Sequence, residues 1–151
     1  MRRAAILLAV ALNLISCRNA PTADVAYDRD GDGRPDKWVY RINESECKIA
    51  YDTNSDGRPD IVKTYKGGQL IEIASDRNFD GRTDLVQIYS EGILSREIHD
   101  DDYDGKLEAI KTFRQGKLAM VERDPRERGQ VDIVEYYDDS GNLTRREVRS
   151  K

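Results

Sequence analysis

A nine-residue acidic stretch recurs at a fixed step of 24 residues, and this repeat constrains the fold more than any other feature of the sequence. The first copy, from position 28, reads Asp-Arg-Asp-Gly-Asp-Gly-Arg-Pro-Asp, and further copies begin at positions 52, 76 and 100. Each copy has oxygen-bearing side chains at its positions 1, 3, 5 and 9 and a glycine at position 6. Oxygen ligands at such a spacing are what a hard cation such as Ca²⁺ requires. A fifth copy, from Asp124, keeps the register but has arginine at positions 3 and 5.

Each acidic stretch is followed by a strand-like segment rich in β-branched and aromatic residues. These segments cover 38–41, 61–65, 85–89, 109–113 and 133–137. Residue pairs ending in glycine, at 67–68, 91–92 and 115–116, then supply two-residue hairpin turns, and a returning strand leads to the next acidic stretch. The sequence therefore predicts an all-β fold: an antiparallel β-meander of about ten short strands, built from five 24-residue hairpin repeats in one curled sheet, with calcium loops between the hairpins.

The register of these hairpins follows from pairing their arms residue by residue. Counting back from the turns places Tyr65 opposite Leu70 and Lys63 opposite Glu72, and Gln87 opposite Arg96. This register predicts one apolar inner face, which Glu97 interrupts. Its members are Trp38, Val62, Val86, Ile110 and Val134, with Ile49, Ile73 and Val121 opposite them. Because 38% of the residues are hydrophobic and 36% are charged, we expect a thin core that bound metal would help to stabilise.

The N-terminal segment has the pattern of an export signal. Arg2 and Arg3 precede an apolar run over 4–14 that is too short to span a membrane but suits a secretory signal peptide. Leu14-Ile-Ser-Cys17 resembles the lipobox of bacterial lipoproteins, which implies cleavage before Cys17 and a lipid on its sulfur. By the same resemblance, Arg18 after the cysteine favours the outer membrane in a host that has one. The alternative is an ordinary signal peptide with an incidental cysteine.

The predicted division of the chain follows from this segment and from the repeat. Residues 1–16 are the lipoprotein signal peptide, 17–24 a lipidated tether, and 25–151 a calcium-binding β-repeat domain. The expected location is the bacterial cell envelope, outside the cytoplasm. Removing Arg2 and Arg3 with the signal peptide makes the mature chain more acidic than the formal charge of −4 for the whole sequence.

The acidic stretch agrees with an EF-hand loop over its first six positions, but it lacks the glutamate at position 12 and precedes a strand, not a helix. Asp-Gly-Arg-Pro-Asp-Ile-Val (56–62) and Asp-Gly-Arg-Thr-Asp-Leu-Val (80–86) instead resemble the calcium loops of FG-GAP repeats and of bacterial adhesin-like repeats. In those families the loop joins two antiparallel strands. The period of 24 is shorter than an FG-GAP blade, so the resemblance is to the loop and not to a propeller.

This resemblance implies up to four bound Ca²⁺ ions, each held by the side chains at positions 1, 3, 5 and 9 and by the backbone carbonyl at position 7. The side-chain ligands would be Asp28, Asp30, Asp32, Asp36; Asp52, Asn54, Asp56, Asp60; Asp76, Asn78, Asp80, Asp84; and Asp100, Asp102, Asp104, Glu108. The carbonyls would come from Arg34, Arg58, Arg82 and Lys106.

Two alternatives to calcium remain at this level. Asp, Asn and Gly favour turns in any case, so the stretches could be solvated turns without metal. Mg²⁺ is a poorer candidate because it dehydrates reluctantly and takes fewer protein ligands. In the fifth copy, we hypothesise that a guanidinium from Arg126 or Arg128 pairs with Asp124 or Asp132 in place of a metal; a loop that simply extends into solvent is the alternative.

Catalytic motifs are absent from the sequence. His99 is the sole histidine, and we expect it to have a supporting or a surface role and not that of a general base. Cys47 has no partner if Cys17 carries lipid, so we expect a small buried side chain, with a reactive thiol as the alternative. Basic residues are mixed with acids, which gives no reason to expect nucleic acid as a partner.

The leading functional hypothesis is a lipid-anchored, extracytoplasmic calcium-binding repeat protein, not an enzyme, with a structural or adhesive role. Its partners would be the membrane, through the lipid on Cys17, and a protein or a glycan. The main alternative is an envelope lipoprotein that acts as an enzyme accessory or inhibitor, with purely structural calcium. A calcium-dependent hydrolase is the third hypothesis, and four equivalent sites disfavour it.

Overall fold

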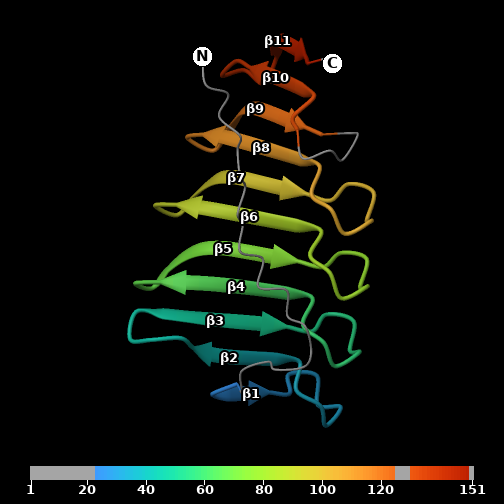
Figure 1. Ribbon diagram of the computed structural model, residues 1–151. Coiled ribbons are helices and arrows are strands. Elements are labelled where there is room, and N and C mark those ends of the chain that lie inside the picture. Colours follow the sequence, from blue (N-terminus) through green and yellow to red (C-terminus); the bar gives the residue numbers. More distant parts are fainter. Residues whose placement is uncertain (1–22, 125–129, 150–151) are drawn as a thin grey trace.

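A computed structural model describes residues 23–124 and 130–149 of the chain, which form a single antiparallel sheet. Eleven strands follow one another in chain order as a meander, without a crossover (Figure 1). They are β1 (Val25–Tyr27), β2 (Lys37–Arg41), β3 (Glu46–Tyr51), β4 (Ile61–Lys66), β5 (Gln69–Ser75), β6 (Leu85–Ser90), β7 (Ile93–His99), β8 (Ala109–Arg114), β9 (Lys117–Arg123), β10 (Ile133–Tyr137) and β11 (Leu143–Val148). The predicted all-β meander is thus confirmed.

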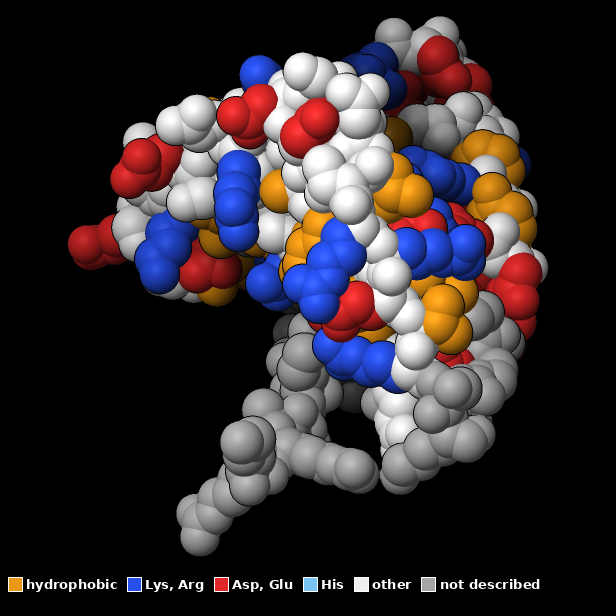
Figure 2. All heavy atoms as spheres, turned by 90° about the horizontal axis from the view of Figure 1, so that it is seen from above, with side chains coloured by type: hydrophobic (Ala, Val, Ile, Leu, Met, Phe, Trp, Pro, Cys, Tyr) orange, Lys and Arg blue, Asp and Glu red, His pale blue; other side chains and the backbone are white. Residues whose placement is uncertain are grey.

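The sheet is open and only weakly curved. β1 and β11 are its two edges, and each pairs with one neighbour only. Seen along the stack of strands, the outline is bent, and basic, acidic and hydrophobic side chains are interspersed over this end of the molecule (Figure 2). Within the described residues there is no helix that could cross a membrane.

The predicted two-residue turns are present and have the backbone that a tight hairpin needs. Both central residues have positive φ: 58° and 77° at 67–68, 53° and 78° at 91–92, and 51° and 77° at 115–116. Positive φ at both positions is the type I′ geometry, whose twist matches that of paired strands. Glu91 and Gln115 adopt this backbone at the first turn position, although it is unfavourable for residues other than glycine.

The predicted pairing is wrong by one residue beyond the first rungs of each hairpin. Tyr65 does pair with Leu70, but the next pair is Thr64 with Glu72, so Ile71 is an extra residue in a β-bulge. Ser95 and Ala119 are the extra residues in the next two hairpins, and Thr144 is the extra residue in the last. The hydroxyls of Ser95 and Thr144 donate to the carbonyls of Ile88 and Tyr136 across the pair, at 2.9 and 3.1 Å, which stabilises the bulges.

The bulges change which residues share a face. One face, here called the apolar face, carries a row of partners that recurs every 12 residues: Trp38, Ala50, Val62, Ala74, Val86, Ile98 and Ile110. Glu122 follows in this row, and Val134 follows Glu122. The placement of Ile49, Ile73 and Val121 on this face was wrong.

Those three residues lie on the opposite face, here called the mixed face, together with Glu97. Glu122, and not Glu97, therefore interrupts the apolar row. The core is thin, as expected. Its fully buried apolar side chains come from both faces and are Ala50, Leu85, Val86, Ile98, Ala109, Val121 and Val134.

The bulge-shifted register can be tested at Ile98, whose side chain is 1% exposed on the apolar face. Ile98→Ala should cost about 3 kcal/mol of unfolding free energy, because it leaves a cavity in a core with few other contacts. Ile93→Ala, the matched change in the same strand at a side chain that is 50% exposed, should cost less than about 0.5 kcal/mol. Urea denaturation at fixed calcium concentration measures both, and equal losses would contradict the observed register.

Candidate metal centres

Acidic loops lie at one end of the strands, opposite the hairpin turns, as the four that are fully described show (Figure 1). They connect β1 to β2, β3 to β4, β5 to β6, β7 to β8 and β9 to β10. Because each 24-residue unit contributes two neighbouring strands, successive loops come side by side. We number them loops 1 to 5; residues 125–129 of loop 5 fall outside the described part of the chain.

Backbone hydrogen bonds close each loop and connect it to the next. The N–H at loop position 9 donates to the residue before the loop, as Asp84 does to Ser75 at 2.9 Å. The N–H at position 1 of the following loop donates to the carbonyl at position 9, as Asp100 does to Asp84 at 2.8 Å. The first bond recurs in all five loops, and the second recurs at each of the four junctions between successive loops. Loop geometry and strand register are therefore mechanically connected.

Inside each loop the carboxylates accept hydrogen bonds from the loop's own backbone. In loop 3, Asp76 accepts from the N–H groups of Phe79 and Gly81, both at 2.7 Å, and Arg82 N–H donates to Asp80 at 2.8 Å. Loops 1, 2 and 4 repeat this pattern at the same positions. The glycine at position 6 has φ between 87° and 90° in these loops, which explains why glycine stands there.

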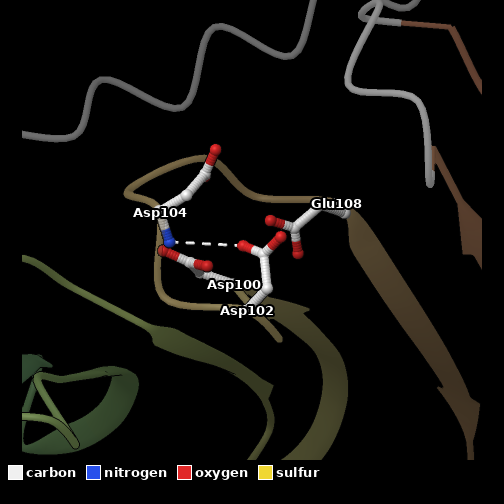
Figure 3. Close-up of side chains that lie close together, drawn as sticks. All are labelled: Asp100, Asp102, Asp104 and Glu108. Carbon is white, nitrogen blue, oxygen red and sulfur yellow. Dashed lines mark hydrogen bonds between the residues drawn. The ribbon is translucent and has the colours of Figure 1, made fainter.

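Four clusters of carboxylates are positioned to bind a metal ion. In each cluster one oxygen from every member lies within 4.8 Å of the others. Loop 4 brings together all four predicted side-chain ligands, Asp100, Asp102, Asp104 and Glu108 (Figure 3). Loops 2 and 3 each bring together the carboxylates of positions 1, 5 and 9, namely Asp52, Asp56 and Asp60, and Asp76, Asp80 and Asp84. Their position 3 is an asparagine, whose Oδ1 accepts the N–H of position 5.

Loop 1 departs from the prediction at position 9. Asp28, Asp30 and Asp32 form its cluster, but Asp36 is outside it. The Asp36 carboxylate instead pairs with the guanidinium of Arg29, at 2.9 Å. Arginine at loop position 2 was a weak sequence signal for this contact, because loop 3 also has one there, Arg77, and yet keeps Asp84 in its cluster. Site 1 therefore has its three clustered carboxylates at positions 1, 3 and 5 and lacks the one at position 9.

Three buried carboxylate oxygens have no hydrogen-bond partner among the described residues. They are Oδ1 of Asp84, in a side chain that is 1% exposed, Oε1 of Glu108, and Oδ1 of Asp124 in loop 5. Asp84 and Glu108 stand at position 9 of a cluster, whereas Asp124 stands at position 1 of loop 5 and belongs to no cluster among the described residues. A buried charged oxygen without a partner is costly, and a cation bound at the cluster would satisfy those of Asp84 and Glu108.

The electrostatics of position 9 in loops 3 and 4 agree with this interpretation. Burial raises the pKa of the Asp84 carboxyl and the charges of Asp76 and Asp100 raise it further, against hydrogen bonds from Arg77 and Asn78 that lower it. The pKa of Glu108 is raised in the same way, first by burial. At position 1 of loop 1, by contrast, hydrogen bonds from Gly31 and Gly33 lower the pKa of the exposed Asp28.

Three contacts near the loops were not predicted from the sequence. The guanidinium of Arg82 donates to the Asp104 carbonyl at 3.0 Å and lies against Gly105, so that loop 3 is directly connected to loop 4.

The prediction that His99 has a surface role was wrong. Its ring is 6% exposed and lies between Glu97, at 3.1 Å, and Asp101 of loop 4, at 3.6 Å. The expected supporting role fits this position.

The remaining predicted residues have these outcomes. The N–H groups of Arg34, Arg58, Arg82 and Lys106 donate to the position 5 carboxylate of their own loops. Cys47 is a free, half-buried thiol on the mixed face, between Arg41 and Tyr65. Arg126, Arg128 and Cys17 lie outside the described residues, so the arginine hypothesis for loop 5 stays a prediction; Gln130 N–H does donate to Asp124 there, at 2.9 Å.

Comparisons with known proteins identify no family for this chain: no family model and no curated protein matches it. Among solved structures it is similar to a chain of accessory secretory protein 1, 2 and 3 of Streptococcus pneumoniae (17% identity, TM-score 0.47) and to a chain of the GtfA/B complex (11% identity, TM-score 0.35). Each match covers 87% of this chain but 22% of the other chain. Similarity at this level is too low to carry an argument about function.

The unpartnered oxygen of Asp84 allows a test by substitution. Asp84→Asn should shift the melting temperature in opposite directions without metal and with calcium. A carboxyl whose pKa is raised by folding favours the folded state at low pH and opposes it as pH rises through the folded pKa. In EDTA at neutral pH, Asp84→Asn should therefore melt higher than the parent protein. The gain should shrink as the pH falls toward the ordinary aspartate pKa of 3.8.

In calcium the order should reverse, because the variant loses a ligand of site 3. With calcium at ten to a hundred times the dissociation constant, the lost binding amounts to about 1.4–2.7 kcal/mol. Asp139→Asn, at an exposed carboxylate in the β10–β11 turn, is the matched control and should shift neither curve. A variant that melts lower than the parent protein equally in EDTA and in calcium would mean that Asp84 serves only as a turn residue.

Proposed function

We propose that this chain is a lipid-anchored, extracytoplasmic calcium-binding repeat protein whose metal loops order a single-layer sheet with a structural or binding role. The observation that carries the proposal is the pair of buried, unpartnered oxygens on Asp84 and Glu108, each within a cluster of carboxylates. A hydrogen-bonded turn would explain the carboxylates at positions 1 and 5 of loops 1 to 4, but it does not explain these two.

Calcium is the cation that best fits the donor set. All members of the clusters offer oxygen, and neither histidine nor cysteine takes part, which disfavours zinc and other transition metals. Three or four carboxylates supplied by one short loop suit an ion that accepts six to eight oxygens in flexible geometry. Mg²⁺ demands a tighter octahedron and retains more of its water.

Metal binding would act on the fold through the base of each loop. The carbonyl and N–H of position 9 hold the strands on both sides of the loop, so that fixing its carboxylate also fixes the pairing of the strands. No second layer covers the described sheet, and its core is small. Binding that favours the folded state by mass action would supply the stability that the core lacks.

The location rests on the sequence. The charged start, the apolar run and Leu14-Ile-Ser-Cys17 together support export, cleavage and lipidation of Cys17. Extracytoplasmic calcium is compatible with weak sites, because extracellular modules bind it with dissociation constants of about 10⁻⁴–10⁻³ M. The anchor and the metal sites thus favour the same compartment.

The experiment that tests this function is a calorimetric titration of the EDTA-treated, dialysed protein with Ca²⁺ and with Mg²⁺. We expect calcium to bind at up to four sites and magnesium to bind more weakly. Asp104→Ala should remove one site, because Asp104 belongs to the most complete cluster. Asp139→Ala, which makes the same charge change outside the loops, should leave the stoichiometry unchanged. Failure to bind calcium, or equal stoichiometry in both variants, would refute the assignment.

A further inference from the structure

The mixed face has a different chemistry at its N-terminal end from the rest of its length. Over β1 to β4, its side chains other than Cys47 are aliphatic, aromatic or basic, and none is Asp or Glu. We call the central group of these residues the basic patch. It consists of Tyr27, Lys37, Val39, Ile49, Tyr51 and Lys63, which the strand pairing places next to one another.

Further along the same face, acidic residues balance the basic ones. Glu97 lies 3.1 Å from His99 and 3.9 Å from Lys111. Glu135 lies 3.5 Å from Arg146 and 4.0 Å from Arg123. The excess of positive charge is therefore largest over the first four strands of this face, where no acidic side chain offsets it.

Aromatic rings, not carboxylates, hold the two lysines of the patch. The Lys37 ammonium lies 5.1 Å from the centre of the Tyr27 ring and 5.9 Å from that of Tyr51, and the Lys63 ammonium lies 5.5 Å from Tyr51. Among the described residues, neither lysine has an ion pair within 4.0 Å. The guanidinium of Arg29 also lies over Tyr51, at 5.4 Å, but Asp36 neutralises it.

Such contacts position the ammonium groups without cancelling their charge, because a cation–π contact adds no counter-ion. The patch therefore presents two positive charges beside tyrosine rings, on the same face as the aliphatic side chains of Val39 and Ile49. Tyr27 is 47% exposed and Val25, beside it in the edge strand, is 45% exposed. Tyrosine with lysine over aliphatic side chains is the combination that suits the interface between lipid headgroups and acyl chains.

We propose that the basic patch binds the surface of an anionic lipid bilayer. This rests on the proposed function for the anchor: if Cys17 carries lipid, only seven residues, 18–24, separate it from β1. Fully extended, they reach about 25 Å, so the first strands stay within that distance of the bilayer. Basic residues near an anionic membrane each add to the attraction, and that attraction weakens with added salt.

The test is co-sedimentation of the full-length chain carrying Cys17→Ser, which cannot be lipidated, with vesicles of phosphatidylcholine alone or with added phosphatidylglycerol. Millimolar calcium is kept constant, so that the acidic loops are in one state. Lys37→Gln/Lys63→Gln removes the charges of the patch. Lys48→Gln/Lys66→Gln is the matched control, because it makes the same charge change in β3 and β4 at positions that alternate onto the apolar face.

We expect the parent chain to bind the anionic vesicles and to be released by salt. The patch variant should bind them about tenfold or more weakly, whereas the control should bind as the parent does. Residues 1–16 are present in every arm, so their own affinity for lipid cancels in the comparison. Equal loss in both variants, or no preference for anionic over neutral vesicles, would overturn the proposal. A face that binds a protein partner and not lipid would give the second of these results.

Failure here and failure of the proposed function are distinguishable. Calcium stoichiometry is measured on the same Cys17→Ser chain. Lipid on Cys17 is measured on the parent protein, by the mass of the chain isolated from membranes. Normal calcium binding and a lipidated Cys17, together with no vesicle binding by the patch, would overturn this inference alone.

Discussion

The repulsion among carboxylates in the acidic loops is the constraint on which the rest of this structure depends. Three or four carboxylates have oxygens within 4.8 Å of one another in each of four loops. Backbone N–H groups accommodate those at positions 1 and 5, but hydrogen bonds from the loop do not neutralise the net charge. At position 9, burial adds a desolvation cost, which is why the pKa values of Asp84 and Glu108 are raised. A bound cation is the simplest remedy for both costs.

Hydrogen bonds connect each acidic loop to the next, so that the state of one loop affects its neighbours. Each loop base shares a backbone hydrogen bond with the next loop, and Arg82 adds a side-chain contact from loop 3 to loop 4. The strands contribute little core of their own, since the described sheet has no covering layer and its buried apolar side chains are divided between two faces. In a repeat of this kind, stability accumulates from contacts between neighbours, so that the loops and the hairpins depend on one another.

Much of the architecture could be predicted from the 24-residue period alone. The acidic loops, the strands that follow them and the glycine turns all lie where the repeat places them, because each depends on local chemistry. The register could not be predicted, since a β-bulge adds one residue to a strand without changing the turn. Ser95 and Thr144 were a weak signal for it, as their hydroxyls bond across the bulge. At the sites, Asp36 departed from the pattern because Arg29, a residue outside the ligand motif, competes for its carboxylate.

Thermal unfolding of the parent protein in EDTA and in millimolar calcium tests the central claim most directly. If the loops hold the strands through bound calcium, the midpoint should rise with calcium concentration and should continue to rise beyond saturation, as binding to the folded state requires. Magnesium at the same concentration should shift it less. An unchanged melting temperature in calcium would contradict the account. It would mean that the acidic loops are stable without a cation and are ordinary solvated turns.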